Sequence, residues 1–317
     1  MIQEPKIIQL SQIKNALKNI DLFKDIEEGF KSYSRGEAII PPVGEMIFED
    51  PPGDLHIKYG YLKSGQFYVV KLASGFYQNP QLGLSSSQGM MLLFDQKTGV
   101  VKGVLLDHGY LTDIRTAVAG AIAAKYLAPK AVSCIGIVGT GIQGKFRLEY
   151  LSSVTTCRKV IVYARSAEKG EAYKSHFKDT DWQIEVTDDL QYLAKNSRLI
   201  VTTTPAKAPL LEAEWIQAGT HITAMGADTA EKIELATQIL GKAEVVVVDS
   251  ISQSKTRGEV YQAVRAGTIR RTQAIELGKV IADPTLGRTS PKQITVADLT
   301  GVAVQDLMIA KAVYEGV

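Results

Sequence analysis

Three glycines with a fixed spacing are the clearest sign of chemistry in the sequence. They are Gly139, Gly141 and Gly144 in the segment SCIGIVGTGIQG, which follows an apolar β-branched run and precedes a helical pattern. In this context the first glycine permits a tight turn, the second lets the backbone approach a pyrophosphate, and the third allows close packing of helix on strand. Free N–H groups at the start of that helix attract the pyrophosphate. The motif therefore predicts a dinucleotide site.

The end of the next expected strand bears on which dinucleotide binds. Enzymes that use NAD usually carry an acidic residue there, which binds the ribose 2′-hydroxyl. This chain reads VIVYARS, so Ala164, Arg165 and Ser166 follow the strand without an acid. Arg165 and Ser166 could hold a 2′-phosphate, since the arginine fork matches phosphate geometry, although Arg165 could also be an ordinary solvated arginine. The sequence favours NADP and leaves NAD open.

An aspartate follows a later strand end. Asp228 stands in HITAMGAD, and ligands of doubly wound sheets bind beyond the carboxyl ends of the strands. In one interpretation Asp228 is only the N-cap of a helix over residues 229–236. In the other it lies beside the nicotinamide and moves protons on a substrate nitrogen. Its position alone does not decide between these two interpretations.

Two basic residues are candidates to bind a carboxylate. Lys71 lies in the apolar run QFYVVKLA, where a buried lysine needs a partner. It could bind the carboxylate of an amino or keto acid, or it could extend to solvent from an edge strand. Arg115, in GYLTDIRTA, opens the helix that leads to the glycine motif. An arginine there could hold a carboxylate or a cofactor phosphate bidentately.

Composition excludes several other classes of protein. Lys and Arg (36) nearly balance Asp and Glu (34), which leaves a net charge of +2 and no basic stripe for nucleic acid. Cys134 and Cys157 are the two cysteines, too few for a disulfide framework or a metal cluster. The N-terminal segment lacks the apolar region of a signal peptide, and the apolar stretch 131–144 is too short to span a bilayer. We therefore expect a cytoplasmic protein with no metal and no nucleic-acid or membrane partner.

The elements that would position these residues fall into two groups, as the length of 317 residues suggests. Helical spacing over 8–34 precedes strand-like runs at 55–62, 66–73, 90–95 and 100–106, which predicts α+β structure with an antiparallel or mixed sheet. After an Ala-rich helix over 116–127, short β-branched runs alternate with helical stretches, the pattern of a parallel sheet covered by helices. The expected strands are 132–138, 160–163, 199–203, 221–225, 245–248 and 294–296, followed by a helix over 299–316.

Five segments in the same order resemble the ornithine cyclodeaminase/μ-crystallin family over nearly the whole chain. They are the Lys71 strand, LLDHGYLTDIRTAVAGAIAAKYLAPK, GTGIQG, HITAMGADTAEKIEL and ITVADLTGVAVQD. The resemblance implies an α/β fold in which a Rossmann-type doubly wound parallel sheet, residues 113–297, is inserted into a second domain. That α+β domain, residues 1–112 plus 298–317, would bind the substrate and form a homodimer. The implied chemistry acts on the C–N bond of α-amino or α-imino acids with a nicotinamide cofactor.

The resemblance also implies roles for particular residues. Asp228 matches the acid/base carboxylate, Lys71 the lysine that binds the substrate carboxylate, and Gly301 a point where the backbone nears the substrate. Positions that contact the cofactor, besides the three glycines and residues 164–166, are Ser86, Arg115, Ile142, Gln143, Thr204, His221, Ala224, Met225, Lys232 and Thr300.

Departures from the cyclodeaminases within this family bear on the substrate. Glu45 stands where they carry an arginine, and His56 stands where they carry a glutamate that receives the distal ammonium of ornithine. Lys58 lies two residues beyond His56, on the same strand face. Cationic groups in a desolvated pocket repel an ammonium. We therefore expect an NAD(P)H-dependent reductase of small α-imino acids, of the ketimine or iminosuccinate type, that runs reversibly as an amino-acid dehydrogenase. The alternatives are a cyclodeaminase that makes proline from ornithine and a non-catalytic NADPH-binding protein like μ-crystallin.

Overall fold

The computed structural model describes residues 4–76 and 78–317, which form two compact units. We name the first the terminal unit, because it contains both ends of the chain, up to Thr116 and from Val302 onward. The second, the inserted unit, comprises Ala117–Gly301. The chain thus has an α/β fold in which a Rossmann-type unit interrupts a second unit in sequence. Each unit is described below by itself.

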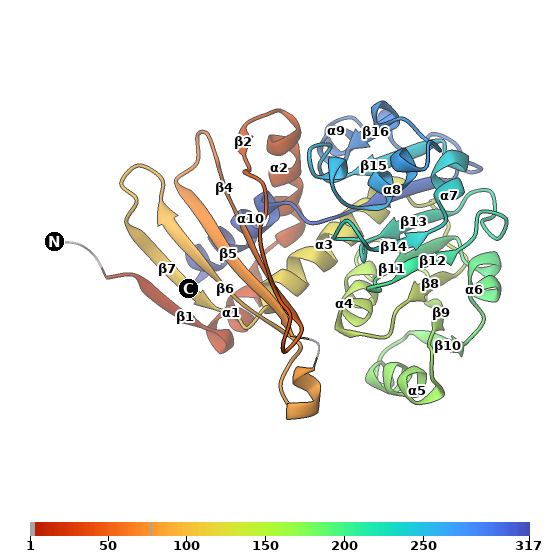
Figure 1. The fold of residues 1–317 in the computed structure, drawn as a ribbon, viewed down its shortest axis with the longest axis horizontal. Helices are drawn as coiled ribbons and strands as arrows, with labels where there is room; N and C mark the ends of the chain where they lie inside the picture. Colours follow the sequence, from red (N-terminus) through yellow and green to blue (C-terminus); the bar gives the residue numbers. More distant parts are fainter. Residues whose placement is uncertain (1–3, 77) are drawn as a thin grey trace. The chain divides into compact units, whose positions relative to one another are not determined.

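The terminal unit is built on a seven-stranded sheet (Figure 1). Its strands are β1 (Lys6–Gln9), β2 (Ala38–Ile39), β3 (Gly44–Phe48), β4 (Gly53–Leu62), β5 (Phe67–Phe76), β6 (Ser87–Asp95) and β7 (Val101–Leu106). They are ordered β1-β7-β6-β5-β4-β2, with β3 paired to β4. The sheet is mixed because β1 runs parallel to β7 while the other pairs are antiparallel.

Helix α10 (Ala303–Gly316) covers one face of this sheet. It packs on β4, β5 and β6, and also on α2 (Leu22–Ser34) (Figure 1). Because it has neighbours on two sides, most of its residues are buried, and nearly all of those are small or apolar. The exceptions are Gln305 and Asp306, which are 1% and 0% exposed. Two such polar side chains require partners inside the unit.

Several helices begin at residues other than those expected from the sequence. Residues 8 and 9, expected at the start of a helix, belong to the strand β1 instead, because residues 6–9 pair with β7. The helix expected from residue 116 begins at Tyr110, where the carboxylate of Asp107 accepts a hydrogen bond from the Leu111 N–H at 2.8 Å. The short helices of this part of the chain are α1 (Leu10–Ala16), η1 (Leu17–Asn19) and η2 (Asn79–Leu82), followed by the long α3 (Tyr110–Leu127).

The inserted unit contains an eight-stranded, all-parallel sheet. Its order along the sheet is β10-β9-β8-β11-β13-β17-β15-β16. The strands are β8 (Ile135–Val138), β9 (Lys159–Tyr163), β10 (Gln183–Thr187), β11 (Leu199–Thr202), β13 (His221–Ala224), β15 (Val245–Val248), β16 (Ala274–Glu276) and β17 (Thr295–Asp298). A small separate sheet pairs β12 (Lys207–Leu211) with β14 (Ile233–Leu235).

Alternate residues of the buried strands supply two cores, one on each face of this sheet. Ile135 and Ile137 belong to one core, whereas Val138 belongs to the other. The first core includes residues of α3, α4 (Ile142–Leu151) and α5 (Ala167–His176). The second includes residues of α6 (Leu190–Asn196), α7 (Thr237–Lys242) and α8 (Glu259–Arg265). This is why the strands read as continuous apolar runs. The remaining helix and 3-10 helices of the unit are η3 (Gln253–Lys255), η4 (Arg271–Gln273), α9 (Leu277–Ala282) and η5 (Pro284–Leu286).

The described residues, 4–76 and 78–317, contain no helix that is both long enough and apolar enough to cross a bilayer.

Candidate active site

The glycine motif forms the turn between β8 and α4, at the point where the strand order of the inserted sheet reverses. β9 lies on one side of β8 and β11 on the other, which opens a crevice at the carboxyl ends of the strands. Gly139 has a φ of +124°, a conformation that a side chain would strain. A Cβ added to Gly144 would collide with the carbonyl oxygen of Gly139. By contrast, a Cβ added to Gly141 would meet nothing within 4 Å, so this residue borders open space.

A cavity of about 500 Å³ lies beside this turn. Its charged lining residues are the cations Lys145, Arg165 and Lys169, and the lining includes no carboxylate. The cavity also has Tyr163 and Tyr173 in its wall, which offer aromatic surface. The complete lining is Gly139, Thr140, Gly141, Lys145, Tyr163, Arg165, Lys169, Ala172, Tyr173, Thr203, Thr204, Pro205, Ala206 and Leu210. The cavity is cationic and lies at a helix N-terminus, and Gly141 leaves room for a ligand to approach the backbone. These features fit a dinucleotide.

The residues after β9 have distinct structural roles. Ala164 is buried, and its N–H donates to the carbonyl oxygen of Thr187. Ser166 is the N-cap of α5, since its hydroxyl accepts from the Lys169 N–H at 3.4 Å. Arg165 is exposed and lines the cavity. Arg165 and Lys169 are therefore the cations available to a phosphate at this edge.

Gly144→Ala is expected to lower the free energy of unfolding by about 1–3 kcal/mol, because the added methyl group collides with backbone that cannot move aside cheaply. Differential scanning calorimetry measures the loss. Gly141→Ala is the matched control, since its φ is an ordinary −72° and a Cβ there meets no atom within 4 Å. Equal melting temperatures for the two variants would contradict the packing argument.

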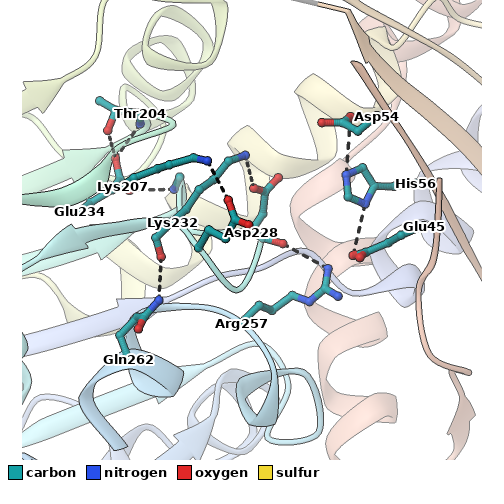
Figure 2. A network of polar contacts seen from close by, with 12 residues as sticks. Glu45, Asp54, His56, Thr204, Lys207, Asp228, Lys232, Glu234, Arg257 and Gln262 are labelled. Atoms are coloured by element: carbon teal, nitrogen blue, oxygen red, sulfur yellow. Dashed lines mark hydrogen bonds and ion pairs between the residues drawn. The ribbon is translucent and has the colours of Figure 1, made fainter. Parts of the chain in front are cut away.

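Glu234, on β14, connects the loops at two strand ends. Its buried carboxylate accepts hydrogen bonds from the Thr202 hydroxyl (2.7 Å), from the N–H and hydroxyl of Thr204 (2.6 and 2.8 Å) and from the Gly226 N–H (2.8 Å). Burial raises the pKa of Glu234 above its ordinary value, although these hydrogen bonds oppose the shift. Figure 2 shows Glu234 below Thr204. The carboxylate fixes Thr204, which lines the cavity, and the start of the loop that carries Asp228.

Asp228 lies in this loop after β13. Its carboxylate accepts a hydrogen bond from Lys232 Nζ at 2.6 Å, and 46% of its side chain is exposed (Figure 2). Its carbonyl oxygen accepts from Arg257 Nη1 at 3.1 Å. The interpretation of Asp228 as a helix N-cap is wrong, because residues 229–236 form turns and β14 instead of a helix. What remains is a partly exposed carboxylate beyond a strand end, with a lysine beside it.

Three further buried carboxylates, which were not predicted from the sequence, accept hydrogen bonds near the neighbouring strand ends. Glu259 accepts from the Glu234 and Leu235 N–H groups at 2.7 and 3.2 Å, and burial raises its pKa well above the ordinary value. Asp298 accepts from the Val260 N–H at 2.8 Å, and burial raises its pKa to about 7. Asp249 accepts from the Thr300 hydroxyl (3.2 Å) and the Gly301 N–H (2.5 Å). Across residues 4–76 and 78–317, no group of His, Cys, Asp or Glu side chains is placed to hold a metal.

In the terminal unit, Lys71 and Arg115 share one carboxylate. Lys71 Nζ lies 3.1 Å and Arg115 Nε 3.0 Å from Oδ1 of Asp306, and Arg115 Nη1 donates to Gln305 at 2.9 Å. The polar residues of α10 are thus the partners of these cations. The interpretation of Lys71 as an edge-strand lysine that extends to solvent is wrong, because β5 lies between β4 and β6 and Lys71 is 2% exposed.

The pKa shifts of Lys71 and Asp306 have different causes. Burial, together with the charges of Arg115 and Lys58, lowers the pKa of Lys71 to about 7 despite the opposing effect of Asp306. Burial alone would raise the pKa of Asp306, but the charges of Lys71, Arg115 and Lys58 lower it. In an isolated ion pair both charged forms would be favoured. Here the charged form of Asp306 is favoured, whereas burial disfavours the ammonium form of Lys71.

Comparison with known proteins identifies the family of this chain. Its sequence matches the ornithine cyclodeaminase/mu-crystallin family over residues 3–317. The chain belongs to this family. The resemblance of the five segments is thereby confirmed, and so is the expected Rossmann-type fold.

Three solved structures closely match the chain. An archaeal alanine dehydrogenase dimer with bound NAD is 35% identical, with a TM-score of 0.90, over 99% of this chain and 96% of that one. Δ1-pyrroline-2-carboxylate reductase of Thermococcus litoralis, in complex with NADH and L-proline, is 26% identical, with a TM-score of 0.91 and coverages of 98% and 97%. Iminosuccinate reductase of Paracoccus denitrificans, in complex with NAD⁺, is 31% identical, with a TM-score of 0.89 and coverages of 99% and 96%.

One residue that the family resemblance marked as a cofactor contact lies in the wrong place for that role. His221 is at the amino end of β13, whereas dinucleotides bind at the carboxyl ends. It is fully buried, and its two ring nitrogens lie 2.8 and 2.9 Å from the hydroxyls of Thr295 and Thr223. Burial lowers its pKa to about 3. Its position indicates a neutral core histidine that links β13 to β17.

The other marked residues are distributed over both units. In the inserted unit, Ile142 is 55% exposed at the start of α4, beside Gln143. Ala224 ends β13, and Met225 directly follows it. In the terminal unit, Ser86 precedes β6 and its carbonyl oxygen accepts from the Phe76 N–H.

His56, on β4, has a carboxylate on each side. Its Nδ1 lies 3.6 Å from Oε1 of Glu45, and its Nε2 lies 3.6 Å from Oδ1 of Asp54 (Figure 2). The antiparallel register places Glu45 directly opposite His56. The immediate surroundings of His56 are therefore acidic, a feature that the sequence did not reveal.

Proposed function

We propose that this protein is an NAD(P)H-dependent reductase of small α-imino acids that runs reversibly as an amino-acid dehydrogenase. The observation that carries the proposal is the pair of buried cations Lys71 and Arg115, which share the single carboxylate of Asp306. A substrate carboxylate would be a further anionic partner for these two cations. The dinucleotide cavity in the inserted unit and the family relatives that act on alanine, iminosuccinate and pyrroline-2-carboxylate support the same reaction class.

Different residues of the chain would have different roles in this reaction. Lys71 and Arg115 bind the α-carboxylate, and the bidentate geometry of the guanidinium orients it. Asp228 moves a proton to or from the substrate nitrogen and stabilises the positive charge of an iminium. Lys232 Nζ, which donates to Asp228 Oδ1 at 2.6 Å, helps to position this carboxylate. When bound, the nicotinamide supplies a hydride to the imine carbon or accepts one from the amino acid. In this assignment the terminal unit binds the substrate and forms the homodimer.

A direct assay tests this function. Purified protein is mixed with NADPH or NADH and a panel of 2-oxo acids plus ammonia, and the near-ultraviolet absorbance of the reduced nicotinamide is followed. Loss of reduced cofactor in proportion to the oxo acid is the expected result. Absence of turnover with every oxo acid, together with tight NADPH binding, would replace the proposal with a non-catalytic binding protein.

The second candidate is an ornithine cyclodeaminase. Glu45 and Asp54 beside His56 favour it, because two carboxylates could attract the distal ammonium of ornithine. Incubation with ornithine and NAD⁺ separates the two functions. Release of ammonia and formation of proline without a change in absorbance would establish the cyclodeaminase.

For the cofactor, we propose NADP(H) as the preferred form. Arg165 and Lys169 line the cavity, and no acidic residue in the lining would bind a ribose 2′-hydroxyl. Arg165→Gln is expected to weaken NADPH binding by about 10- to 100-fold, the worth of a hydrogen bond to a charged group, and to change NADH binding little. Fluorescence titration measures both affinities, with Lys174→Gln on the exposed side of α5 as control. Equal loss for the two cofactors would contradict the assignment, as would tighter NADH binding by the unmodified protein.

A further inference from the structure

Glu234 holds two loops of the inserted unit through the two oxygens of one carboxylate. Oε1 accepts hydrogen bonds from the N–H (2.6 Å) and the hydroxyl (2.8 Å) of Thr204. Oε2 accepts from the Gly226 N–H (2.8 Å) and from the Thr202 hydroxyl (2.7 Å). The side chain is 0% exposed. An ionised carboxylate offers about four acceptor sites, so these donors satisfy it fully.

Each of the two loops has its own part in the proposed reaction. We name residues 203–206 the cofactor loop, because all four line the dinucleotide cavity. We name residues 225–228 the acid/base loop, because it ends at Asp228, whose N–H donates to the Gly226 carbonyl oxygen at 3.1 Å. The two loops also touch, since a Cβ added to Gly226 would collide with the Thr204 carbonyl oxygen. A ligand in the cavity therefore borders a segment that contacts the acid/base loop.

The four donors explain why a glutamate stands at position 234. A hydroxyl can either donate or accept, but a backbone N–H can only donate. Each carboxylate oxygen of Glu234 receives one such N–H, from Thr204 or from Gly226. A glutamine has a single acceptor oxygen, so in either orientation its NH₂ group would face one of these N–H groups. Among side chains of this length, only glutamate can hold both loops at once.

Strand β14 gives Glu234 a fixed base. The Ile233 N–H donates to the carbonyl oxygen of Ala206 at 2.9 Å. The N–H groups of Glu234 and Leu235 donate to the carboxylate of Glu259 at 2.7 and 3.2 Å. Because the backbone on both sides of Glu234 is held, its side chain forms a continuous hydrogen-bonded connection between the two loops. Energetic coupling between sites can travel through such a connection.

We propose that Glu234 is a positioning residue that couples occupation of the dinucleotide cavity to the placement of Asp228. Thr204, Glu234 and Asp228 are seen together in Figure 2. When the cavity is filled, the cofactor loop is restricted, and the carboxylate of Glu234 transmits this restriction to Gly226, two residues before Asp228. This inference rests on the proposed function, in which Asp228 moves the proton of the substrate nitrogen. The acid/base group thus takes its working position only once the cofactor is bound.

Hydrogen exchange tests this coupling without turnover. The probe is ADP-ribose 2′-phosphate, which is NADPH without its nicotinamide ring and so fills the cavity without placing that ring beside Asp228. ADP-ribose is run alongside. We expect the probe to slow exchange of the Gly226 N–H about 5- to 150-fold in the unmodified protein, the usual range of coupling between two sites. In Glu234→Gln the cofactor loop should still respond, whereas Gly226 should not. Mass spectrometry follows both loops.

Glu244→Gln is the matched control. Glu244 precedes β15 at the amino end of the sheet, and its carboxylate accepts a single backbone N–H, from Ile294 at 2.7 Å. A glutamine can keep that bond, so this variant should respond to the probe like the unmodified protein. Glu234→Asp, whose carboxylate is withdrawn by one methylene from both loops, replaces Glu234→Gln if the latter does not fold.

A merely structural role for Glu234 makes a different prediction. In that case Glu234→Gln lowers the melting temperature, but the probe slows exchange at Gly226 as much as in the unmodified protein. This result overturns the inference. Absence of any slowing at Gly226 in the unmodified protein, with either probe, also overturns it.

Kinetics then connects the coupling to Asp228. With 2-oxo acids, ammonia and NADPH, kcat is expected to fall about 10- to 100-fold in Glu234→Gln and to stay constant in Glu244→Gln. Added to Asp228→Asn, Glu234→Gln should lower kcat little further, because it acts through Asp228. Additive losses would contradict this route. If exchange at Gly226 depends on Glu234 but no oxo acid is reduced, the coupling stands and the proposed function fails.

Discussion

Asp228→Asn is expected to lower kcat about 10²- to 10⁴-fold, the usual contribution of a positioned acid/base group. Asparagine has nearly the same shape but cannot exchange a proton with the substrate nitrogen. The loop itself should persist, because the Arg257 contact is made to the backbone carbonyl of residue 228, and Glu234 holds Gly226. NADPH affinity is therefore expected to stay within about twofold of the original.

Steady-state kinetics across a pH series measures this effect. The pH dependence of kcat that reports the acid/base group should disappear in the variant. Asp188→Asn is the control, since Asp188 is exposed before α6. Full reductase activity of Asp228→Asn with an unchanged pH profile would show that another group handles the proton.

The second large effect is expected from Lys71→Met. Loss of a charged hydrogen bond to the substrate carboxylate costs about 1.5–3 kcal/mol, so kcat/KM should fall by about 10- to 100-fold. Because the pKa of Lys71 is about 7, its ammonium form is lost above that pH in the ligand-free protein. The KM of the unmodified protein should therefore rise as pH increases beyond 7, and this rise should be absent from the variant.

Folding stability gives an independent check on Lys71. Its pKa falls from 10.5 to about 7 on folding, so between these values the unfolded chain binds one proton more than the folded chain. The free energy of unfolding therefore increases with pH across this window. Urea titrations at several pH values should show that increase in the unmodified protein and a smaller one in Lys71→Met. Identical pH dependence in the two proteins would mean that Lys71 is not the titrating group.

Some parts of the site follow directly from local sequence. The turn at Gly139–Gly144 is specified by residues that neighbour one another along the chain, and the β-branched runs before and after it define the buried strands. The same holds for Asp228, which follows an apolar run and a Gly-Ala pair. Local steric and hydrophobic constraints decide these features, so a single sequence is enough to predict them.

Other parts depend on partners distant in sequence. In the sequence, Glu234 resembles an ordinary surface glutamate. In the structure it is buried, and its carboxylate accepts hydrogen bonds from Thr202, Thr204 and Gly226. Residues 229–236 have the composition of a helix, but pairing of β14 with β12 takes precedence. Lys71 reads as a lysine of uncertain exposure until Asp306, 235 positions later, is placed beside it. Tertiary contacts decide these cases, and no local pattern encodes them.

The position of α10 in the chain has a consequence for the order of events during synthesis. Every residue of the inserted unit, Ala117–Gly301, is translated before Gln305 and Asp306. Domains generally fold as units, but β17 (Thr295–Asp298), which lies between β13 and β15 in the inserted sheet, directly precedes α10 in the chain. Until α10 arrives, however, Lys71 and Arg115 lack the side chains that neutralise them, and the interior of the terminal unit cannot close over them. The parallel sheet of the inserted unit and the carboxylate-binding cluster of the terminal unit therefore both depend on a late segment of the chain, β17 and α10.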